Sequence, residues 1–216
     1  MSDKKIFDYP GEQVDVHWDG RLCIHIAECG HAEGDLFTTG RQPWCVPDKA
    51  TADEVAEVCG RCPSGALTYS DKSGKSEQAD EENTVNVIYN GPLYLSGELA
   101  IEGAADDMTG VAFRAALCRC GQSKNKPFCD NSHHEAGFKD FGAVGETGPG
   151  LEAGGGTLKV KPLPDGPLLL SGNLSMVSGS GRLAWQGDSV ALCRCGESKK
   201  KPFCDGSHKA AGFRSD

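Results

Sequence analysis

Three cysteines and one histidine occur twice in this chain at identical spacing, and these residue types are able to bind a metal together. Both sets read CxCx8Cx3H. Their members are Cys118, Cys120, Cys129 and His133 in the first set, and Cys193, Cys195, Cys204 and His208 in the second. Three thiolates and one imidazole form a four-ligand set that suits either a structural zinc ion or an iron-sulfur cluster.

The spacing within each set bears on the choice between these metals. Two cysteines one residue apart can reach adjacent positions on one iron, whereas structural zinc sites usually separate paired cysteines by two to four residues. The third cysteine and the histidine would then hold a second iron. The spacing therefore favours an iron-sulfur cluster, and zinc stays as the alternative.

An internal repeat surrounds the two sets. The segment GPLYLSGEL from Gly91 aligns with GPLLLSGNL from Gly166 without a gap, at an offset of 75 residues (166 − 91 = 75). The match continues through the ligand segments to Phe138 and Phe213. The C-terminal two thirds of the chain is therefore predicted to be a duplication.

The two ligand segments, CRCGQSKNKPFCDNSH and CRCGESKKKPFCDGSH, resemble the signature of the CDGSH iron-sulfur domain family, also called the NEET family. The resemblance implies a [2Fe-2S] cluster held by three cysteines and one histidine in each signature. It also implies that two signatures in one chain form an internal pseudo-dimer. The first segment departs from the family at Asn131, where the second has Gly206, and asparagine tolerates the left-handed backbone conformation better than most residues.

The histidine ligands predict two properties of these clusters. A neutral imidazole in place of a thiolate makes a cluster less negative, which raises its reduction potential, as in Rieske centres. Protonation of the coordinating nitrogen would break the bond, so His133 and His208 are expected to couple cluster retention to pH.

Residues beside the ligands have candidate supporting roles as cofactor-binding residues. Ser123 and Ser198 either donate hydroxyl hydrogen bonds toward sulfur or form turns. Asp130 and Asp205 either steer the neighbouring ligands or cap backbone amides, and capping is the role we expect.

A third group of cysteines lies upstream. Cys23 and Cys29 form Cx5C, and Cys62 precedes Pro63 in CPSGAL, a Cys-Pro ending typical of bacterial ferredoxin motifs. The segment from about Val14 to Tyr69 resembles the divergent single-cluster ferredoxin domain, and this resemblance implies a [4Fe-4S] or [3Fe-4S] cluster.

The fourth ligand of this upstream cluster is open. Ile26 occupies the middle position of a Cx2Cx2C run, and three cysteines alone suit [3Fe-4S]. Cys59, one helical turn before Cys62, and Cys45 are candidates to complete a [4Fe-4S] site, with His25 a weaker one. The alternative for Cys45 and Cys59 is a small buried side chain in the core.

Composition limits the function classes. The net charge of −9 and the pI of about 5.1 match the nucleic-acid backbone poorly. No run of 18 apolar residues and no signal peptide is present in the sequence, so we expect a cytoplasmic protein without membrane contact. Thiols stay reduced there and eleven cysteines cannot all pair, which again favours metal coordination over disulfides.

Charge near the ligands differs from that of the whole chain. Both ligand segments carry excess lysine and arginine, Arg119 among them, so each is predicted to be a basic rim. Such rims would stabilise reduced clusters or dock an acidic redox partner or cluster acceptor, whereas the alternative is simple solvation.

The remaining patterns predict the elements that position the ligands. Alternating apolar residues predict strands at 14–18, 93–101 and 168–176, and the capping box Thr51 to Glu54 predicts a helix that follows it. One short helix is expected after each of Asp130 and Asp205, ended by Gly137 and Gly212.

These predictions give an α+β chain. It comprises a small ferredoxin-like domain (1–70), an acidic linker (71–83), a first β-rich repeat (84–140), a glycine-rich flexible linker (141–156) and a second repeat (157–216). The predicted function is electron transfer by a monomeric multi-cluster iron-sulfur protein, with cluster transfer or redox sensing as a related role. A zinc-stabilised interaction module is the rival, and an enzyme acting on small molecules has little support.

Overall fold

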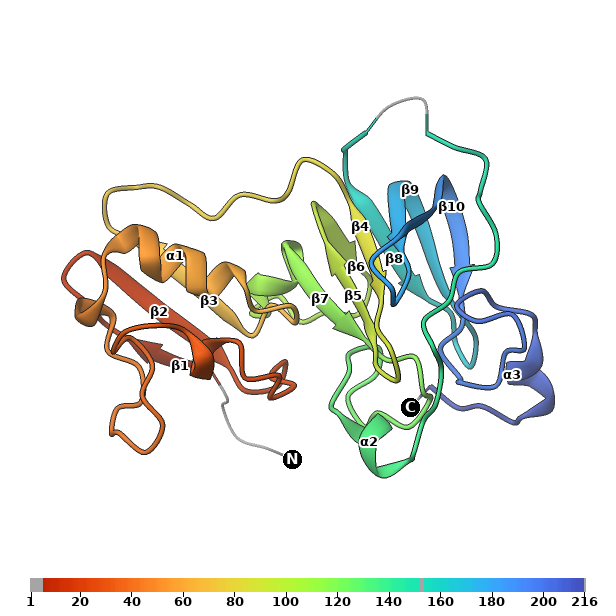
Figure 1. The fold of residues 1–216 in the computed structure, drawn as a ribbon, viewed down its shortest axis with the longest axis horizontal. Coiled ribbons are helices and arrows are strands. Elements are labelled where there is room, and N and C mark those ends of the chain that lie inside the picture. The colour runs from red at the N-terminus through yellow and green to blue at the C-terminus, as the bar shows by residue number, and fades with distance from the viewer. Residues whose placement is uncertain (1–5, 152–153, 216) are drawn as a thin grey trace.

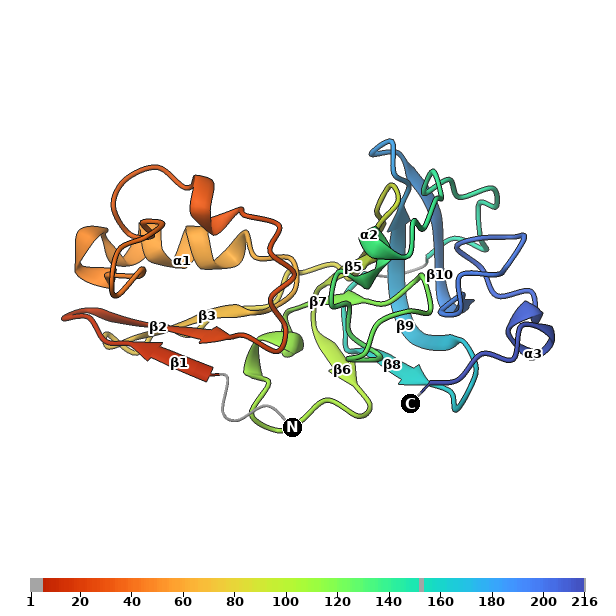
Figure 2. The same ribbon diagram turned by 90° about the horizontal axis from the view of Figure 1, so that it is seen from below.

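A computed structural model describes residues 6–151 and 154–215, and these form a small α/β unit beside a larger β unit (Figures 1 and 2). The small unit contains β1 (Ile6–Tyr9), β2 (Val14–Asp19) and β3 (Leu67–Asp71) in an antiparallel sheet of order β1-β2-β3. Helix α1 (Ala52–Gly60) lies across one face of this sheet. The mixture of sheet and helix agrees with the predicted α+β class.

The predicted strand and helix of the small unit are both present. Val14 and Val16 of β2 are buried, as a half-buried strand requires. Thr51 accepts the amide of Glu54, and the Glu54 carboxylate accepts the amide of Thr51, so the capping box begins α1. Val55 and Val58 then point from α1 into the core on the sheet.

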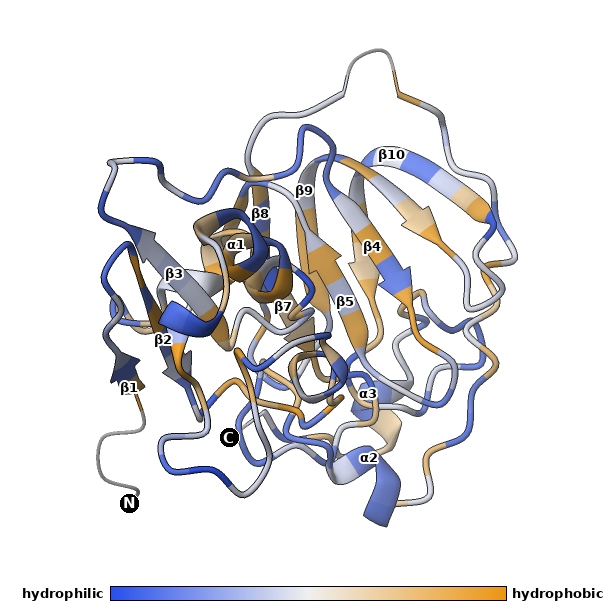
Figure 3. Cartoon of the chain, turned by 60° about the vertical axis from the view of Figure 1, so that its left-hand side comes forward, coloured by the Kyte–Doolittle hydropathy of each residue, from blue (hydrophilic) through white to orange (hydrophobic). Residues whose placement is uncertain are grey.

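The large unit is a seven-stranded sheet formed by both repeats. Its strands are β4 (Thr84–Val87), β5 (Leu93–Ser96), β6 (Leu99–Ile101), β7 (Arg114–Leu117), β8 (Leu158–Pro162), β9 (Leu168–Val177) and β10 (Leu183–Leu192). The short helices are η1 (Cys29–His31), η2 (Pro47–Lys49), η3 (Thr109–Ala112), α2 (Ser132–Glu135) and α3 (Ser207–Ala210). Helices α2 and α3 lie at the same end of the sheet (Figures 1 and 3).

The two repeats exchange strands. Within repeats, β4 pairs with β5 and β8 with β9, both antiparallel. Between repeats the pairing is parallel: β4 lies beside β9, with Thr84 opposite Ser175, and β6 lies beside β8, with Ala100 opposite Lys159. Adding the repeat offset of 75 to one register reproduces the other, because Thr84 corresponds to Lys159 and Ala100 to Ser175. One apolar core runs through both repeats.

The predicted linkers are attached to the sheet over part of their length. Asn83, at the end of the acidic segment, is 2% exposed and donates to the carbonyls of Gly156 and Asn173. In the glycine-rich segment Val144 is buried, and the backbone of Thr147 and Gly150 pairs with Gln186 of β10. Residues 152 and 153 of this predicted linker, like 1–5 and 216 of the terminal units, lie outside the described residues.

The small unit is docked on the first repeat. Leu22 and Ala66 belong to the same hydrophobic core as the strands of the repeats. The Arg114 side chain of β7 donates to the carbonyls of Cys62 and Leu67 at 2.8 and 3.2 Å. Figure 3 shows apolar residues continuing along the strands behind this junction. The loop that carries Cys62 is therefore held directly against the repeat.

Candidate metal centres

Each repeat brings its four predicted ligands together as two close pairs. In the first repeat the Sγ atoms of Cys118 and Cys120 are 3.8 Å apart, and Cys129 Sγ lies 3.6 Å from His133 Nδ1. In the second repeat the corresponding distances are 3.7 Å, between the Sγ atoms of Cys193 and Cys195, and 3.5 Å, between Cys204 Sγ and His208 Nδ1.

These separations fit two donors on one tetrahedral metal. Two sulfurs bound at ordinary metal–thiolate length lie about 3.7 Å apart, and a sulfur and an imidazole nitrogen about 3.6 Å. Among the residues that the structure describes, no three cysteine, histidine or acidic side chains converge on a single ion position. The donor set of each repeat thus consists of two pairs, each suited to one metal ion. We call each pair a corner of the site.

The ligand loops are fixed to the ends of the strands that precede them. Strand β7 runs directly into Cys118, and Leu117 forms an isolated bridge with Phe128. The Cys118 amide donates to the Pro127 carbonyl at 2.8 Å and the Cys129 amide to the Ala116 carbonyl at 2.8 Å. In the second repeat, Leu192 and Phe203 form the equivalent bridge. The sheet therefore sets the distance between the two corners of each site.

Backbone amides point at the sulfurs. The Gln122 amide lies 3.4 Å from Cys120 Sγ, and the Asn131 amide lies 3.4 Å from Cys129 Sγ. Glu197 and Gly206 repeat these contacts on Cys195 and Cys204 at 3.4 Å. Amide dipoles stabilise negative charge on sulfur, which is the charge that a thiolate ligand carries.

The first-repeat histidine is more enclosed than the second. His133 is 6% exposed, whereas His208 is only half-buried. Burial lowers the pKa of His133, with neighbouring His134 and Arg119 adding to the effect. The neutral ring, which is the form that binds metals, is favoured there.

The two serines stabilise the ligand loops through hydrogen bonds to backbone groups. Ser123 Oγ donates to the Phe128 carbonyl at 2.6 Å and accepts the Asn125 amide at 3.0 Å. Ser198 makes the same bonds with Phe203 and Lys200. Of the two roles considered, sulfur donation and turn formation, the hydrogen bonds support the second, because the single hydroxyl proton is given to a carbonyl.

The aspartates between ligand and helix accept backbone amides. Asp130 binds the amides of Lys124 and Ser132 at 2.8 and 3.0 Å, and Asp205 binds those of Lys199 and Ser207 at the same distances. Hydrogen bonds from Ser207 and the Lys199 amide hold the pKa of Asp205 far below its usual range. Both aspartates thus hold the first backbone amide of α2 or α3, while the cap positions themselves are occupied by Asn131 and Gly206, which form no side-chain cap hydrogen bond.

Arg119 is not part of a basic rim. It is 1% exposed and turns back from the ligand loop to donate to the carbonyls of Gly91 and Ile88, and it pairs with Asp140. Arg194 does the same with the carbonyls of Gly166 and Leu163. Since both guanidiniums are buried, the positive charge that the ligand segments present to solvent is smaller than the sequence indicates.

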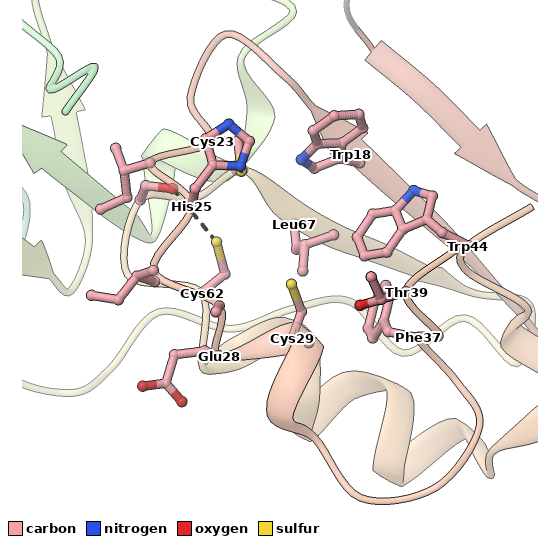
Figure 4. A pocket seen from close by; sticks show the side chains of 16 residues that line it. Trp18, Cys23, His25, Glu28, Cys29, Phe37, Thr39, Trp44, Cys62 and Leu67 are labelled. Atoms are coloured by element: carbon pink, nitrogen blue, oxygen red, sulfur yellow. Dashed lines mark hydrogen bonds between the residues drawn. The ribbon is translucent and has the colours of Figure 1, made fainter. Parts of the chain in front are cut away.

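The upstream cysteines line a separate cavity of about 410 Å³ (Figure 4). Cys23, Cys29 and Cys62 direct their sulfurs toward it, with Trp18 and Trp44 on its far side. The loop around it holds His25 and Ala27 in the left-handed region at φ 51° and 67°. When right-handed and left-handed residues alternate, successive backbone amides point into one concave surface, an arrangement that recurs at iron-sulfur sites.

Neither further cysteine candidate reaches this cavity. Cys45 and Cys59 are 1% and 0% exposed and pack in the core between α1 and the small sheet. Burial raises the pKa of Cys45 to about 12 and raises that of Cys59 further. Their positions match the core alternative. His25 does line the cavity, and its Nδ1 lies 3.7 Å from Cys23 Sγ.

Sequence reasoning missed the residues that join the cavity loop to the first repeat. Asn125 Nδ2 donates to the Arg21 carbonyl at 2.8 Å, and Asn131 Nδ2 donates to the Ile24 carbonyl. The available signal was the duplication itself, since the second repeat has Lys200 and Gly206 at these positions. These two differences lie on the face of the first repeat that contacts the N-terminal domain.

The fold, the paired donors and the cysteine-lined cavity define an iron-sulfur protein with tandem metal-binding domains. Residues 9–72 match the model of the divergent 4Fe-4S mono-cluster family. Residues 90–134 and 165–209 each match the model described as the iron-binding zinc finger of CDGSH type. The chain belongs to the divergent 4Fe-4S mono-cluster family through its N-terminal domain, which a tandem CDGSH pair follows.

Comparison with curated proteins finds relatives of the N-terminal domain. The chain is 41% identical over 64 residues to the uncharacterized protein YjdI of Escherichia coli strain K12, and equally to that of Escherichia coli O157:H7. The aligned segment is 30% of this chain and 84% of each relative. No solved structure matches the chain. None of the helices in 6–151 and 154–215 has the length and apolar character needed to cross a bilayer.

Proposed function

We propose that this protein is a cytoplasmic electron carrier that binds three iron-sulfur clusters. The observation that carries the proposal is the pairing of donors in each repeat at the separation of two ligands on one tetrahedral iron. Two such corners, joined by sulfide, make up a [2Fe-2S] cluster with three cysteines and one histidine. A carrier role needs no substrate pocket at these ligands, and electron transfer is the chemistry such clusters supply when bound.

In this assignment the ligands of the repeats divide by corner. Cys118 and Cys120 would hold one iron of the first cluster, and Cys129 and His133 the other. Cys193 and Cys195, with Cys204 and His208, would do so in the second. This division of ligands is supported by the backbone amides that donate to sulfur, since such donors stabilise a negatively charged thiolate. The sulfurs that accept them are those of Cys120, Cys129, Cys195 and Cys204.

The N-terminal cavity would hold the third cluster through Cys23, Cys29 and Cys62. Three thiolates suit [3Fe-4S], and a [4Fe-4S] form would need a further donor, for which His25 is better situated than Cys59 or Cys45.

We also propose that the tandem repeats act as an internal pseudo-dimer within a monomer. The parallel pairs β4–β9 and β6–β8 support this, since the offset of 75 residues relates their registers. The partner would be a redox protein or cluster acceptor that approaches the exposed lysines beside the ligands, such as Lys124 and Lys199, which favours an acidic surface. The free state of all eleven cysteines fits a reducing compartment.

The half-buried His208 favours a second, related role in cluster transfer. Its ring is accessible while that of His133 is enclosed, so the ligand set of the second repeat is the more open of the two to a cluster acceptor. Loss of visible absorbance at pH 5 to 6 from a Cys62→Ala/Cys129→Ala double variant, in which only the ligand set of the second repeat is complete, measures cluster release from this repeat.

Metal and sulfide analysis of anaerobically purified protein tests the function. We expect about two iron atoms per repeat, about three or four more for the N-terminal domain, and acid-labile sulfide in matching amount. Cys62→Ala should remove only the N-terminal iron, whereas Cys59→Ala, the matched buried control, should retain it. Stoichiometric zinc without sulfide would overturn the proposal in favour of a structural interaction module.

A further inference from the structure

A three-residue segment of the small unit separates the N-terminal cavity from the first repeat. Ile24, His25 and Ile26 line the cysteine-lined cavity on one side. The same residues line a second cavity, of about 490 Å³, which His133 and Asn131 also line. This segment therefore touches both candidate metal sites.

The contact reaches sulfur on both sides. Ile24 follows Cys23 directly in the chain, and its side chain is 4% exposed and packs in one cluster with Cys129. The Ile24 carbonyl accepts a hydrogen bond from Asn131 Nδ2 at 2.5 Å. The backbone amide of the same Asn131 donates to Cys129 Sγ at 3.4 Å. One covalent link and two hydrogen bonds thus connect a sulfur-bearing residue of each site.

Among the residues that the structure describes, the second repeat has no equivalent connection. Gly206 donates its amide to Cys204 Sγ at 3.4 Å, but it has no side chain to extend the route. Asn131 adopts φ 71° and Gly206 φ 87°, so the two positions share one backbone conformation. Asparagine at this left-handed position is strained relative to glycine, and its carboxamide is what the first repeat gains.

We propose that Asn131 is a positioning residue that connects the N-terminal cluster to the first-repeat cluster, so that electrons pass between them through Cys23, Ile24 and Cys129. The inference rests on the proposed electron-carrier function. It adds that the first repeat, and not the second, exchanges electrons with the N-terminal domain.

The step is a one-electron exchange. The N-terminal centre loses one electron and is oxidised by one unit, while the first-repeat centre gains that electron and is reduced by one unit. No covalent bond forms or breaks and no proton is needed. The electron enters the protein from an external one-electron reductant, for which dithionite serves in the experiment.

Rapid freeze-quench EPR after addition of less than one equivalent of dithionite to the full-length protein tests the proposal. The Cys62→Ala variant identifies which signals belong to the N-terminal centre. In the wild type we expect a fast phase in which the N-terminal and first-repeat signals equilibrate. Asn131→Gly, which installs the residue of the second repeat, should lose this phase while it keeps its iron and its absorption spectrum.

Two variants serve as matched controls. Gly206→Asn makes the reverse exchange in the second repeat and should leave the fast phase unchanged. Asn125→Lys removes the neighbouring bond to the Arg21 carbonyl but leaves the route through Ile24 intact, and should keep the fast phase.

The outcomes separate this inference from the function on which it rests. A wild type without iron-sulfur signals would overturn the proposed function. Loaded, reducible centres that equilibrate equally fast in the wild type and in Asn131→Gly would overturn only the role of Asn131. Equal loss in Asn125→Lys would also overturn it, since docking alone would then explain the effect. If Asn131→Gly loses its first-repeat iron, Asn131→Ala, which removes the carboxamide without adding charge, takes its place with the same expectations.

Discussion

Gly65 of the CPSGAL loop and Gly110 of η3 meet backbone to backbone, and a Cβ on Gly110 would lie 2.0 Å from the Gly65 carbonyl oxygen. A Cβ on Gly65 would lie 2.6 Å from the Gly110 carbonyl oxygen. The N-terminal domain and the first repeat therefore share an interface with no room for a side chain at either position.

Substitution at this interface should destabilise it. We expect Gly110→Ala to cost about 1–3 kcal/mol, because backbone on both sides must shift to admit the methyl group. Thermal unfolding measures the cost, and protease cleavage within 71–83 should accelerate. Gly60→Ala is the control, since that glycine ends α1 with open space around it, and the variant should be unchanged or slightly stabilised.

Removal of the loop hydroxyls should affect stability but not the cluster spectrum. Ser123→Ala leaves the Phe128 carbonyl and the Asn125 amide without their partner, at a cost of about 1–3 kcal/mol. The absorption bands and the reduction potential of the first-repeat centre should stay as in the wild type. A marked shift in potential would instead indicate that the hydroxyl interacts with sulfur.

The buried Cys45 thiol should resist alkylation until high pH. Burial raises its pKa to about 12, against a usual value near 9. At pH 8 its reaction with iodoacetamide should be roughly a thousandfold slower than that of an ordinary thiol.

The pH dependence of Cys45 follows from the sign of this shift. In the folded protein its rate should rise about tenfold per pH unit between pH 8 and 10, and mass spectrometry of the labelled peptide measures it. The Cys45 thiol loses its proton at lower pH in the unfolded chain than in the folded protein. Its contribution to the free energy of unfolding is therefore complete below about pH 9, and the folded state becomes less stable as the pH rises above 9. Guanidine-unfolded protein is the control. Rapid labelling of Cys45 in the folded state would contradict its position in the core.

Asn83 should stabilise the junction of the two repeats. Its amide donates to the carbonyls of Gly156 and Asn173, and its carbonyl oxygen accepts the Glu98 amide at 3.0 Å. Asn83→Ala should cost about 1–3 kcal/mol, because buried backbone groups lose their partners. The midpoint of thermal unfolding checks this, with Asn86→Ala, at a half-exposed position of β4, as the comparison. An equal effect of the two substitutions would refute the special role of Asn83.

Local patterns predicted the elements that local interactions determine. Thr51 and Glu54 marked the start of α1, and Asp130 and Asp205 marked the short helices, because each of these side chains bonds a backbone amide within a few residues. Equal spacing of the ligands is matched by equal close pairs in the two repeats, Cys118 with Cys120 and Cys129 with His133 in the first. These features depend on neighbours along the chain, which the sequence displays directly.

Features that depend on distant partners were not predictable in the same way. Alternation in 84–87 indicates a strand but not that Thr84 would lie opposite Ser175 in a parallel pair. The charge of Arg119 suggested a surface position, whereas the carbonyls of Gly91 and Ile88 provide buried acceptors. Cys59 lies one helical turn before Cys62, but α1 turns its side chain into the core.

The exchange of strands between the repeats affects how this chain could be divided. Strand β4 completes the sheet beside β9, and β6 completes it beside β8, so neither repeat alone possesses all of its own neighbours. A backbone break in the glycine-rich linker (141–156) would leave two fragments that are still held together by the hydrogen bonds of the parallel pairs β4–β9 and β6–β8. Conversely, expression of one repeat without the other would expose unpaired strand edges, and such a fragment would be expected to seek a second copy of itself or to aggregate.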